Sequence, residues 1–342
     1  MKLILIISDE YDGTTSDVCR CLKYLNQNFL RINPIDDVKI KNFHLFDENE
    51  ITLNCNGTDF KLKDVVSFWH RRGTLNIESP ELTNTQKQKR NIFSYGAAIR
   101  QVQKDHSRIR DYLFTFLMKR VPTLGNYFKR HNNKLLDLSL ARQVGLTTPE
   151  TIIETSKSRL EEFIKKYPSG IITKIISDPE ICTIKKDSKL FGYNFFTNKI
   201  QESDLANFPD SFSPSLFQPL ISKKADIRVF FINSKIYSMA ILSQSDKQTS
   251  VDFRRYNHKI PNRKVPFKVP QSVENSIRQL MHKIELNTGS IDFIYGTDDK
   301  FYFLEVNPVG QFGMVSEPCN YYLEMEVAKF LSGVNLPETI VS

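Results

Sequence analysis

Three oxygen-bearing side chains near the C-terminal end have the types and spacing of a divalent cation site. Glu305 and Asn307 stand two residues apart in the apolar segment FYFLEVN, and Asp292 lies in the similar segment IDFIY. Because side chains alternate along a strand, Glu305 and Asn307 should face one way, with Leu304 and Val306 on the other face. If the two segments pair antiparallel, Asp292 approaches both polar residues across the ladder.

Such a set of ligands would suit Mg²⁺, which prefers hard oxygen donors and keeps positions for water and phosphate. We therefore predict a metal site formed by Asp292, Glu305 and Asn307 and completed by a nucleotide. The alternative is that the two acids are edge-strand charges and that Asn307 only begins the turn at the following proline. Three oxygen ligands on one hairpin favour the metal.

Two basic residues interrupt segments that are otherwise apolar. Arg228 lies inside DIRVFF and Lys174 inside IITKII. A fixed cation in a buried strand is costly unless it faces an anion. Arg228 could pair with Asp226 or with an acid of the metal site, or it could face a bound anion.

The elements that must position these side chains begin with an α/β pattern. LILIIS, TSDVCRCLKYLNQ and FLRIN predict a strand, a helix and a strand, which together form a βαβ unit. FHLF and ITLNC flank DENE and predict a hairpin, and VVSFW predicts another buried strand. A mostly helical region extends from about Pro80 to Arg120, and the pattern breaks near VPTLGN, where we place the first domain boundary.

The remaining chain mixes helices with antiparallel strands. A helix in NKLLDLSLARQV ends at Gly145, and a second helix, SRLEEFIKKYP, precedes the strand GIITKII. Short strands follow around EICTIKK and KLFGYNFF. ADIRVFFINSKIYSMAILS predicts two strands joined at Asn233 and Ser234. The helix QSVENSIRQLMHKIEL then leads into a hairpin that turns at Gly296 to Lys300.

Composition and charge limit the function classes. The 342 residues are 40% apolar and 25% charged, as in ordinary globular proteins. The net charge of +8 comes from basic residues that are spread among nearly as many acids. Helix-turn-helix, zinc-finger and basic-repeat patterns are absent from the sequence, so no nucleic acid partner is expected, whereas an anionic nucleotide or an acidic peptide fits.

The cysteine pattern and the lengths of the apolar segments indicate the cellular compartment. The five cysteines are odd in number and include no CxxC pair, so neither a disulfide framework nor a structural zinc site is predicted. Leu3 to Ile7 is too short for the apolar core of a signal peptide. No apolar run approaches the length that crosses a bilayer, so we expect a cytoplasmic protein with no membrane partner.

The arrangement D…E-x-N-P, with a lysine-bearing helix, a lysine-bearing strand and FQPLISKKADIRVF, resembles the ATP-grasp carboxylate ligases. More narrowly, SFWHRRG, NKLLDLSLARQVGLTTPET, QPLISKKADIRVFF, VDFRR and EVNPVGQFG resemble the graspetide branch, which makes microviridin-type ω-ester and ω-amide peptides, and especially its chryseoviridin-type maturases. The resemblance extends from LIISDEYD to YLEMEVAKFL. It implies an α/β (α+β) class with an ATP-grasp fold, divided into an N-terminal α/β pre-ATP-grasp domain (1–125), a central subdomain (126–215) and a C-terminal subdomain (216–342).

The same resemblance implies roles for the basic residues. Lys134 and Lys174 match the lysines that face the nucleotide phosphates, a task that suits a compact point charge on a flexible stem. Arg228, with Lys174, would neutralise charge on the transferring phosphoryl group and the acyl phosphate. Taken alone, each lysine is more typical of a surface residue. The segment Ser177 to Glu180 is the candidate for backbone amides that cover the phosphates.

The family holds adenine with backbone groups of the inter-domain hinge, which matches residues 217–221 and thus Gln218, Pro219 and Leu220. Pro219 stands where an acid commonly follows the glutamine. Because proline supplies a carbonyl but no N–H, we expect the donor to be a neighbour such as Leu220. Lys223 would reach the ribose or phosphate side, with Lys224 beside it as the alternative.

Two basic segments suit an acidic peptide substrate. Arg71 and Arg72 end a predicted buried strand, where an α/β sheet presents its ligand-facing edge. Asp252, Arg254 and Arg255 in VDFRR resemble the family segment that contacts leader or core peptide. Their guanidinium groups could bind carboxylates bidentately. Solvated surface is the alternative for each arginine pair.

The resemblance implies an enzyme that uses ATP and Mg²⁺ to activate Asp or Glu side chains of an acidic, Thr-rich precursor peptide as acyl phosphates. Attack by Thr or Ser hydroxyls would give ω-ester macrocycles, and a homodimer is implied by family analogy. One alternative is an ATP-grasp ligase that forms amides, either Lys lactams or by addition of a free amino acid. A second is a nucleotide-binding regulator without chemistry.

Overall fold

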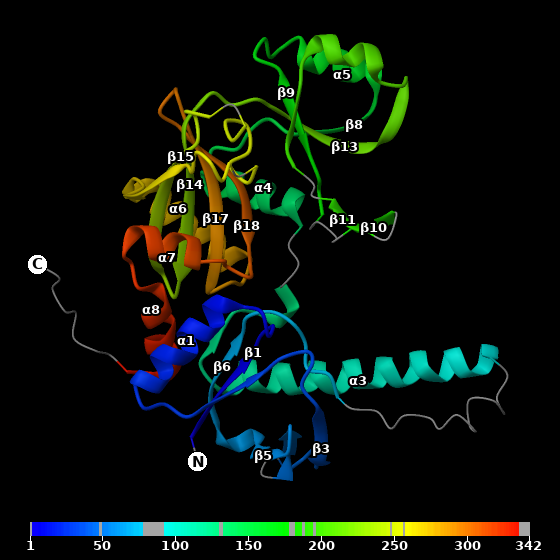
Figure 1. The fold of residues 1–342 in the computed structure, drawn as a ribbon, viewed down its shortest axis with the longest axis vertical. Coiled ribbons are helices and arrows are strands. Elements are labelled where there is room, and N and C mark those ends of the chain that lie inside the picture. The colour runs from blue at the N-terminus through cyan, green and yellow to red at the C-terminus, as the bar shows by residue number, and fades with distance from the viewer. Residues whose placement is uncertain are drawn as a thin grey trace, which may run out of the picture. The chain divides into compact units, whose positions relative to one another are not determined.

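The computed structural model describes residues 2–47, 50–77, 92–129, 133–177, 182–186, 189–193, 196–246, 248–255 and 257–334. The chain forms two compact units. The first contains Met1–Arg130 together with Tyr322–Ser342, and the second contains His131–Tyr321 (Figure 1). The three-domain division at residues 125 and 215 stays a prediction.

The core of the first unit is a parallel sheet with the strand order β2-β1-β6-β7. Its strands are β1 (Leu3–Ile7), β2 (Phe29–Ile32), β6 (Val65–His70) and β7 (Thr123–Leu124). Helix α1 (Gly13–Tyr24) joins β1 to β2, which confirms the predicted βαβ unit. The helix begins where the Asp12 side chain accepts a hydrogen bond from the backbone N–H of Thr15, an N-terminal cap.

A second, antiparallel sheet of the first unit contains β3 (Val38–Asn42), β4 (Thr52–Cys55) and β5 (Thr58–Lys61). The predicted hairpin therefore exists, but the prediction that FHLF forms its first strand is wrong. The strand is VKIKN instead, because Val38 is buried while Lys39 and Lys41 face solvent, which is the alternation of a half-buried strand. The 3-10 turn η2 (Leu62–Asp64) leads into β6.

Two helices complete the first unit. Helix α3 (Ile92–Arg120) confirms the later part of the predicted helical region, whose first part, residues 80–91, lies outside the described residues. The C-terminal half of α3 buries Leu113, Phe114 and Leu117 against the parallel sheet. Helix α8 (Leu323–Ser332) packs on α1, so the end of the chain returns to the unit in which the chain begins.

The second unit contains a four-stranded sheet with the order β12-β9-β13-β8, all neighbours antiparallel. Its strands are β8 (Ile152–Ser156), β9 (Ile171–Lys174), β12 (Asn198–Ile200) and β13 (Ser211–Pro219). Helix α5 (Lys157–Ile164) buries Leu160 and Phe163 against it (Figure 1). The remaining short elements are η3 (Tyr127–Lys129) in the first unit and, in the second, β10 (Cys182–Lys186), β11 (Lys189–Tyr193) and η4 (Glu202–Asn207).

The larger sheet of the second unit has the order β16-β15-β14-β17-β18 and is antiparallel throughout. Its strands are β14 (Lys223–Ile232), β15 (Lys235–Leu242), β16 (Arg263–Phe267), β17 (Thr288–Gly296) and β18 (Phe301–Asn307). Helix α6 (Gln271–Lys283) lies against one face, where Ile277 and Leu280 meet Val229 and Ile291 (Figure 1). Helices α4 (Lys134–Gln143) and α7 (Gly313–Cys319) also contact this sheet.

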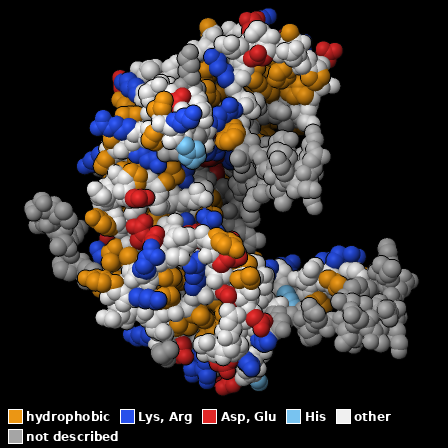
Figure 2. All heavy atoms as spheres, in the orientation of Figure 1, with side chains coloured by type: hydrophobic (Ala, Val, Ile, Leu, Met, Phe, Trp, Pro, Cys, Tyr) orange, Lys and Arg blue, Asp and Glu red, His pale blue; other side chains and the backbone are white. Residues whose placement is uncertain are grey.

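Surface properties agree with the dispersed charge of the sequence. On the face shown in Figure 2, basic side chains are scattered among acidic and hydrophobic ones in both units. Among the described helices, none combines the length and the hydropathy that crossing a membrane requires.

Candidate active site

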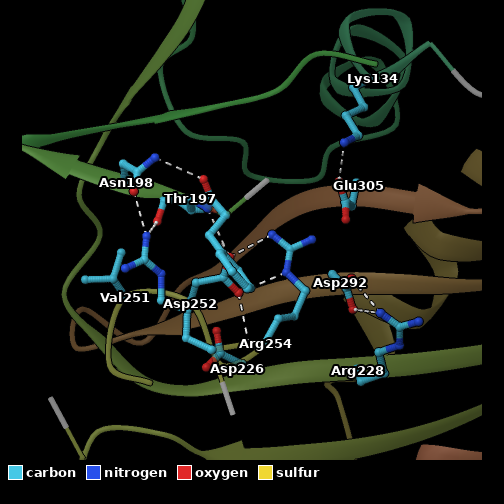
Figure 3. A network of polar contacts seen from close by, with 12 residues as sticks. Lys134, Thr197, Asn198, Asp226, Arg228, Val251, Asp252, Arg254, Asp292 and Glu305 are labelled. Atoms are coloured by element: carbon cyan, nitrogen blue, oxygen red, sulfur yellow. Dashed lines mark hydrogen bonds and ion pairs between the residues drawn. The ribbon is translucent and has the colours of Figure 1, made fainter. Parts of the chain in front are cut away.

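A row of charged residues runs from the central strand of the larger sheet, β14, to its edge strand, β18. Arg228 on β14 is paired in register with Asp292 on β17, and Asp292 is paired in turn with Glu305 on β18. Nη1 of Arg228 donates to both oxygens of Asp292, at 2.9 and 2.7 Å (Figure 3). The hairpin prediction is thus confirmed, and the structure brings the two predicted metal ligands and the predicted catalytic arginine together.

A β-bulge in the hairpin decides which side chains face this row. The register of β17 and β18 shifts after Asp292, so that Phe293 is paired with Phe303 and Leu304 has no partner. Phe303 and Val306 are both in the hydrophobic core, whereas Leu304 lines a pocket on the opposite face. The prediction that Leu304 lies on the face of Val306 is therefore wrong, because strict alternation fails at a bulge.

Lys134 reaches the row from helix α4. Its Nζ lies 3.2 Å from Oε2 of Glu305 (Figure 3). Lys134 is the first residue of the helix, whose N-terminus is capped by the side chain of Asn133. A cation at a helix N-terminus opposes the helix dipole, so this position favours an anion in contact with the lysine.

Lys174, at the end of β9, is the second predicted phosphate lysine. Burial lowers its pKa, while the charge of Glu305 acts in the opposite direction. Within the described residues, no hydrogen bond or ion pair to its ammonium group is found. Ser177, three residues on, provides a carbonyl 3.5 Å from Lys134 Nζ. The rest of the predicted phosphate cover, residues 178–180, lies outside the described part of the chain.

The two central carboxylates have opposite pKa shifts. Burial raises the pKa of Asp292, an effect that Arg228 opposes and Glu305 reinforces. Burial also acts to raise the pKa of Glu305, but Lys134, Lys174 and Arg254 outweigh it and hold that pKa below its ordinary value. Glu305 therefore favours the ionised form. Asp292 is the carboxylate whose ionised form an additional cation would stabilise most.

The third predicted metal ligand has a structural contact of its own. Oδ1 of Asn307 accepts a hydrogen bond from the backbone N–H of Val309, 3.0 Å away, which forms the turn at Pro308. Gly310 has a φ of +59°, which favours glycine, and a Cβ there would make a tight contact, 3.1 Å from Cα of Gly289. The amide oxygen keeps a second lone pair, so turn formation and metal binding are compatible.

The segment VDFRR forms a clamp next to the row. Arg254 binds Asp252 through both Nε and Nη2 at 2.9 Å, and this interaction raises the pKa of Arg254 (Figure 3). Arg255 donates to the carbonyl of Thr197 and the side chain of Asn198. Arg255 thus anchors the loop to the start of β12. Arg254 interacts electrostatically with Asp292 and Glu305.

Lys223 forms a buried ion pair within the protein, and its predicted contact with the ribose or phosphates stays a prediction. Its ammonium group lies 2.8 Å from both oxygens of Asp226, which also accepts a hydrogen bond from Ser243. Both members of the pair are buried. Lys223 lines the same pocket as Leu304, so its backbone and stem adjoin the predicted nucleotide site while its charge is neutralised by Asp226.

The predicted hinge forms one wall of this pocket, which Gln218, Pro219, Leu220 and Ile221 line. The N–H of Leu220 donates to the carbonyl of Gly170 at 3.1 Å, so it is engaged within the protein. For Ile221, no hydrogen bond from its N–H is found among the described residues. We therefore place the available hinge donor at Ile221 rather than at Leu220.

Arg71 and Arg72 lie at the carboxyl end of β6, in the first unit. Nε of Arg71 is 3.2 Å and Nε of Arg72 is 2.8 Å from Oδ2 of Asp12. The Arg71 side chain is buried, and burial lowers its pKa to about 10, while that of Arg72 is one-third exposed. Their contact with substrate stays a prediction, and Arg71 also has the structural role of partner to Asp12.

The residues present fit a divalent cation and an anionic ligand. Cationic side chains outnumber the acids they surround, since Lys134, Lys174, Arg228 and Arg254 face Asp292, Glu305 and Asp252. Nε of Arg228 is buried and has no hydrogen-bond partner among the described residues, so the guanidinium retains donors for an anion. Clusters of three or more His, Cys, Asp or Glu that suit a metal are absent from the described residues, and Asn307 as a third ligand stays a prediction.

Comparisons with solved structures identify the fold of the chain. The macrocyclase MdnC from Microcystis aeruginosa MRC, bound with precursor peptide MdnA, matches with a TM-score of 0.73 and 22% identity over 97% of this chain and 100% of that one. An ATP-grasp ligase from Chryseobacterium gregarium, RiPP-associated and in complex with ADP and a leader and core peptide, matches with a TM-score of 0.69 and 24% identity over 97% and 96%. The chain has the ATP-grasp fold.

A further ATP-grasp ligase, PsnB, complexed with a phosphomimetic variant of a minimal precursor, Mg and ADP, has a TM-score of 0.67 and 13% identity over 97% of this chain and 98% of that one. No protein-family model and no curated protein matches the sequence. The predicted ATP-grasp fold is confirmed by the three structures.

Several residues of this ATP-grasp chain were not predicted to contribute to the site. Asp226 neutralises Lys223, the backbone N–H of Thr197 binds Asp252 of the clamp loop, and Leu304 lines the pocket beside the predicted hinge. Asp226 was considered only as a partner of Arg228. The spacing of Lys223 and Asp226, three residues apart in one strand, was the available signal, but a bulge between residues 223 and 225 brings the two side chains together.

Proposed function

We propose that this protein is an ATP-dependent carboxylate ligase that forms macrocycles in a peptide substrate. The observation that carries the proposal is the row formed by Arg228, Asp292 and Glu305, with Lys134 beside it. A buried excess of positive charge around two carboxylates is suited to a nucleotide triphosphate and its metal. The solved structures with the same fold are described as a macrocyclase and as ligases bound to precursor peptides, ADP and Mg.

The reaction has two steps. An oxygen of a substrate Asp or Glu carboxylate attacks the γ-phosphorus of ATP, and the bond to ADP breaks, which leaves an acyl phosphate. A Thr or Ser hydroxyl then attacks the acyl carbon and loses its proton as inorganic phosphate departs. Each ester therefore removes the elements of one water molecule from the peptide. Holding both groups of one chain close together can provide an effective molarity of about 10⁵–10⁸ M.

Each side chain in and beside the row has a separate role in this reaction. Arg228, whose Nε has no hydrogen-bond partner among the described residues, stabilises the negative charge that develops on the transferred phosphoryl group. Lys134 and Lys174 hold the phosphates as point charges. Asp292, Glu305 and Asn307 would bind Mg²⁺, which supplies charge neutralisation between the phosphates when bound.

The clamp loop is suited to the acidic groups of the peptide. Asp252 occupies the Nε and Nη2 donors of Arg254 and so fixes the orientation of the guanidinium. The other donors of Arg254 remain for a substrate carboxylate, whereas Arg255 anchors the loop through Thr197 and Asn198. We propose that the substrate is an acidic, Thr-rich precursor with leader and core segments.

The test is mass spectrometry of such a peptide after incubation with the enzyme, ATP and Mg²⁺, with Glu305→Gln as the control. Losses of about 18 Da per bond, absent in the control, are expected because each closure removes water. Hydroxide treatment then separates esters, which hydrolyse, from amides, which persist. A heavier product that contains an added amino acid would contradict cyclisation, and unchanged mass despite ATP binding would contradict the enzyme proposal.

The arginine of the clamp provides a narrower prediction. Arg254→Ala should reduce turnover of the full precursor by about tenfold or more, the effect of losing one charge-assisted contact. ADP binding, measured by calorimetry, should change much less. Equal losses in both measurements would contradict a substrate-binding role for Arg254.

Two further properties stay predictions. A homodimer is proposed from family analogy, and sedimentation of the purified protein measures it directly. A cytoplasmic location is proposed from the unpaired pattern of the cysteines.

A further inference from the structure

The loop that carries the clamp contains several buried polar side chains. It joins β15 to β16 and comprises residues 243–262, and Ser243, Thr249, Asp252 and Asn262 are buried among its described residues. Loops usually expose such groups to water, because burying a polar side chain costs free energy unless it is hydrogen-bonded. The partners of these groups therefore determine the conformation of the loop.

A buried ion pair on β14 holds two points of this loop. Asp226 accepts a hydrogen bond from Oγ of Ser243 at 2.6 Å, at the start of the loop. Nζ of Lys223 is held by both oxygens of Asp226, and it also donates to the carbonyl of Val251 at 3.4 Å. Val251 directly precedes Asp252, the acid of the clamp (Figure 3). One carboxylate thus supports both the beginning of the loop and the clamp itself.

Hydrogen bonding, rather than core packing, explains why this pair is charged. A buried ion pair gains little stability over an apolar pair of the same volume, because both charges lose their hydration. An apolar pair, however, could neither accept from the hydroxyl of Ser243 nor donate to the carbonyl of Val251. The pair of Lys223 and Asp226 therefore specifies one arrangement of the loop against β14.

This arrangement brings the clamp to the row of charges. Asp226 and Arg228 are two residues apart on β14, so their side chains lie on one face of the strand. The charge of Arg254 acts to lower the pKa of Glu305 and opposes the rise in the pKa of Asp292, which means that the guanidinium lies near both carboxylates. The loop is thus held on the face where the substrate carboxylate would react.

We propose that Asp226 is a positioning residue that acts through its two donors to set the guanidinium of Arg254 against the substrate carboxylate. The donors are Lys223 and Ser243. This inference rests on the proposed function, and it assigns the orientation of the clamp to groups that do not themselves contact the peptide. Weakening this network should therefore impair binding of the peptide.

The first experiment compares two buried serines in steady-state turnover of the precursor peptide that the wild type cyclises. Ser243→Ala removes a donor to Asp226 and should raise the KM for the peptide about three- to tenfold, the effect of one hydrogen bond. The dissociation constant of ADP, measured by calorimetry, should be unchanged. Ser238→Ala is the matched control, because Ser238 is a buried serine of β15 that donates to the carbonyl of Phe267 on β16. It should leave both quantities unchanged.

A double-mutant cycle separates positioning from a general structural effect. If the network acts through Arg254, then Ser243→Ala should change kcat/KM less than about twofold in an enzyme that already carries Arg254→Ala. A full effect of Ser243→Ala in that background would overturn the inference, and so would an equal rise in KM in Ser243→Ala and Ser238→Ala.

A further variant removes the ion pair without leaving a buried charge. Lys223→Met combined with Asp226→Leu retains the volume of both side chains, so circular dichroism should show a folded protein. The KM for the peptide should rise at least as much as in Ser243→Ala. A wild-type KM in this variant or in Ser243→Ala would overturn the inference and leave the ligase proposal intact. Absence of turnover by the wild type would instead overturn both.

Discussion

Single side chains in the candidate site are balanced so that each cation has a carboxylate nearby and the group as a whole retains positive charge. Arg228 binds Asp292, Lys134 binds Glu305 and Arg254 binds Asp252. Removing Asp292 therefore leaves the buried Arg228 unpaired, and removing a cation leaves a buried carboxylate. Substitutions that retain charge therefore separate the effect of geometry from the effect of losing an ion pair.

Arg228→Lys retains the charge that Asp292 needs but loses the planar fork of donors. We expect turnover of the peptide to fall about 10²- to 10³-fold, the usual cost of losing one preorganised donor to a developing charge. ADP binding should be largely retained, since Lys134 and Lys174 still face the phosphates.

The matched control is Arg278→Lys, on an arginine of α6 that pairs with Glu274 outside the site. It should leave turnover unchanged. Single-turnover rates with saturating ATP distinguish the two variants, and an Arg228→Lys enzyme of normal rate would remove Arg228 from the mechanism.

The residues of the site were predictable where a charge interrupts an apolar strand. Arg228, Asp292 and Glu305 belong to this class. The engagement of Leu220 N–H by Gly170 was not predictable, because it depends on how β13 ends against the turn before β9. The same is true of Arg255, whose partners lie almost 60 residues earlier in the chain.

Strands and turns position the row of charges, and one turn carries backbone strain. The β14–β15 hairpin turns at Asn233 and Ser234, with φ values of 43° and 72°. Two-residue hairpin turns of this kind prefer Asn followed by Gly, because Gly adopts positive φ without steric cost.

Ser234→Gly should therefore raise the free energy of unfolding by about 0.5–1 kcal/mol, since the strain at a positive φ is relieved. Ser234→Ala is the control and should not stabilise, because alanine keeps the Cβ. Urea unfolding followed by circular dichroism measures both, and a more stable Ser234→Ala would show that the turn strain is not the cause.

The two long hairpins of the second unit were predicted from alternating apolar residues and turn signals. The bulge at Leu304 was not, because a bulge is a property of two paired strands and leaves no mark in one strand read alone. It changed the face of only one residue, since Glu305, Val306 and Asn307 keep the predicted alternation.

At the scale of the whole molecule, the stability of the first unit can be followed separately from that of the second. The first unit contains the only tryptophan, Trp69, so its fluorescence reports that unit. It also contains the buried Asp12, which pairs with the buried Arg71 and the partly exposed Arg72. Burial acts to raise the pKa of Asp12, but the two arginines and the Thr15 N–H outweigh it and lower that pKa below 3.8.

A carboxyl group with a lowered pKa in the folded state stabilises the fold above its unfolded pKa, and this contribution is lost as the pH falls through the folded value. The wild type should therefore lose stability in the first unit below about pH 4. Asp12→Asn should lower the free energy of unfolding at pH 7 by about 3–5 kcal/mol, because Arg71 is left buried without its counter-charge.

In that variant, the additional loss of stability on acidification below pH 4 should be smaller. Trp69 fluorescence in urea titrations from pH 3 to pH 7 measures both effects. Asp17→Asn on the same helix, where the acid pairs with the exposed Arg20, is the control and should change little. Equal acid sensitivity of wild type and Asp12→Asn would assign that sensitivity to other carboxylates.

The return of α8 to the first unit has a consequence for biosynthesis. A ribosome makes the chain from its N-terminus, so β1 and α1 are exposed long before residues 323–332 exist to cover α1. The second unit, whose residues are continuous in sequence, can finish folding in that interval. Native packing of the N-terminal unit must therefore wait until residues 323–332 have been translated, and a nascent chain stalled before residue 323 would present an uncovered helix to chaperones.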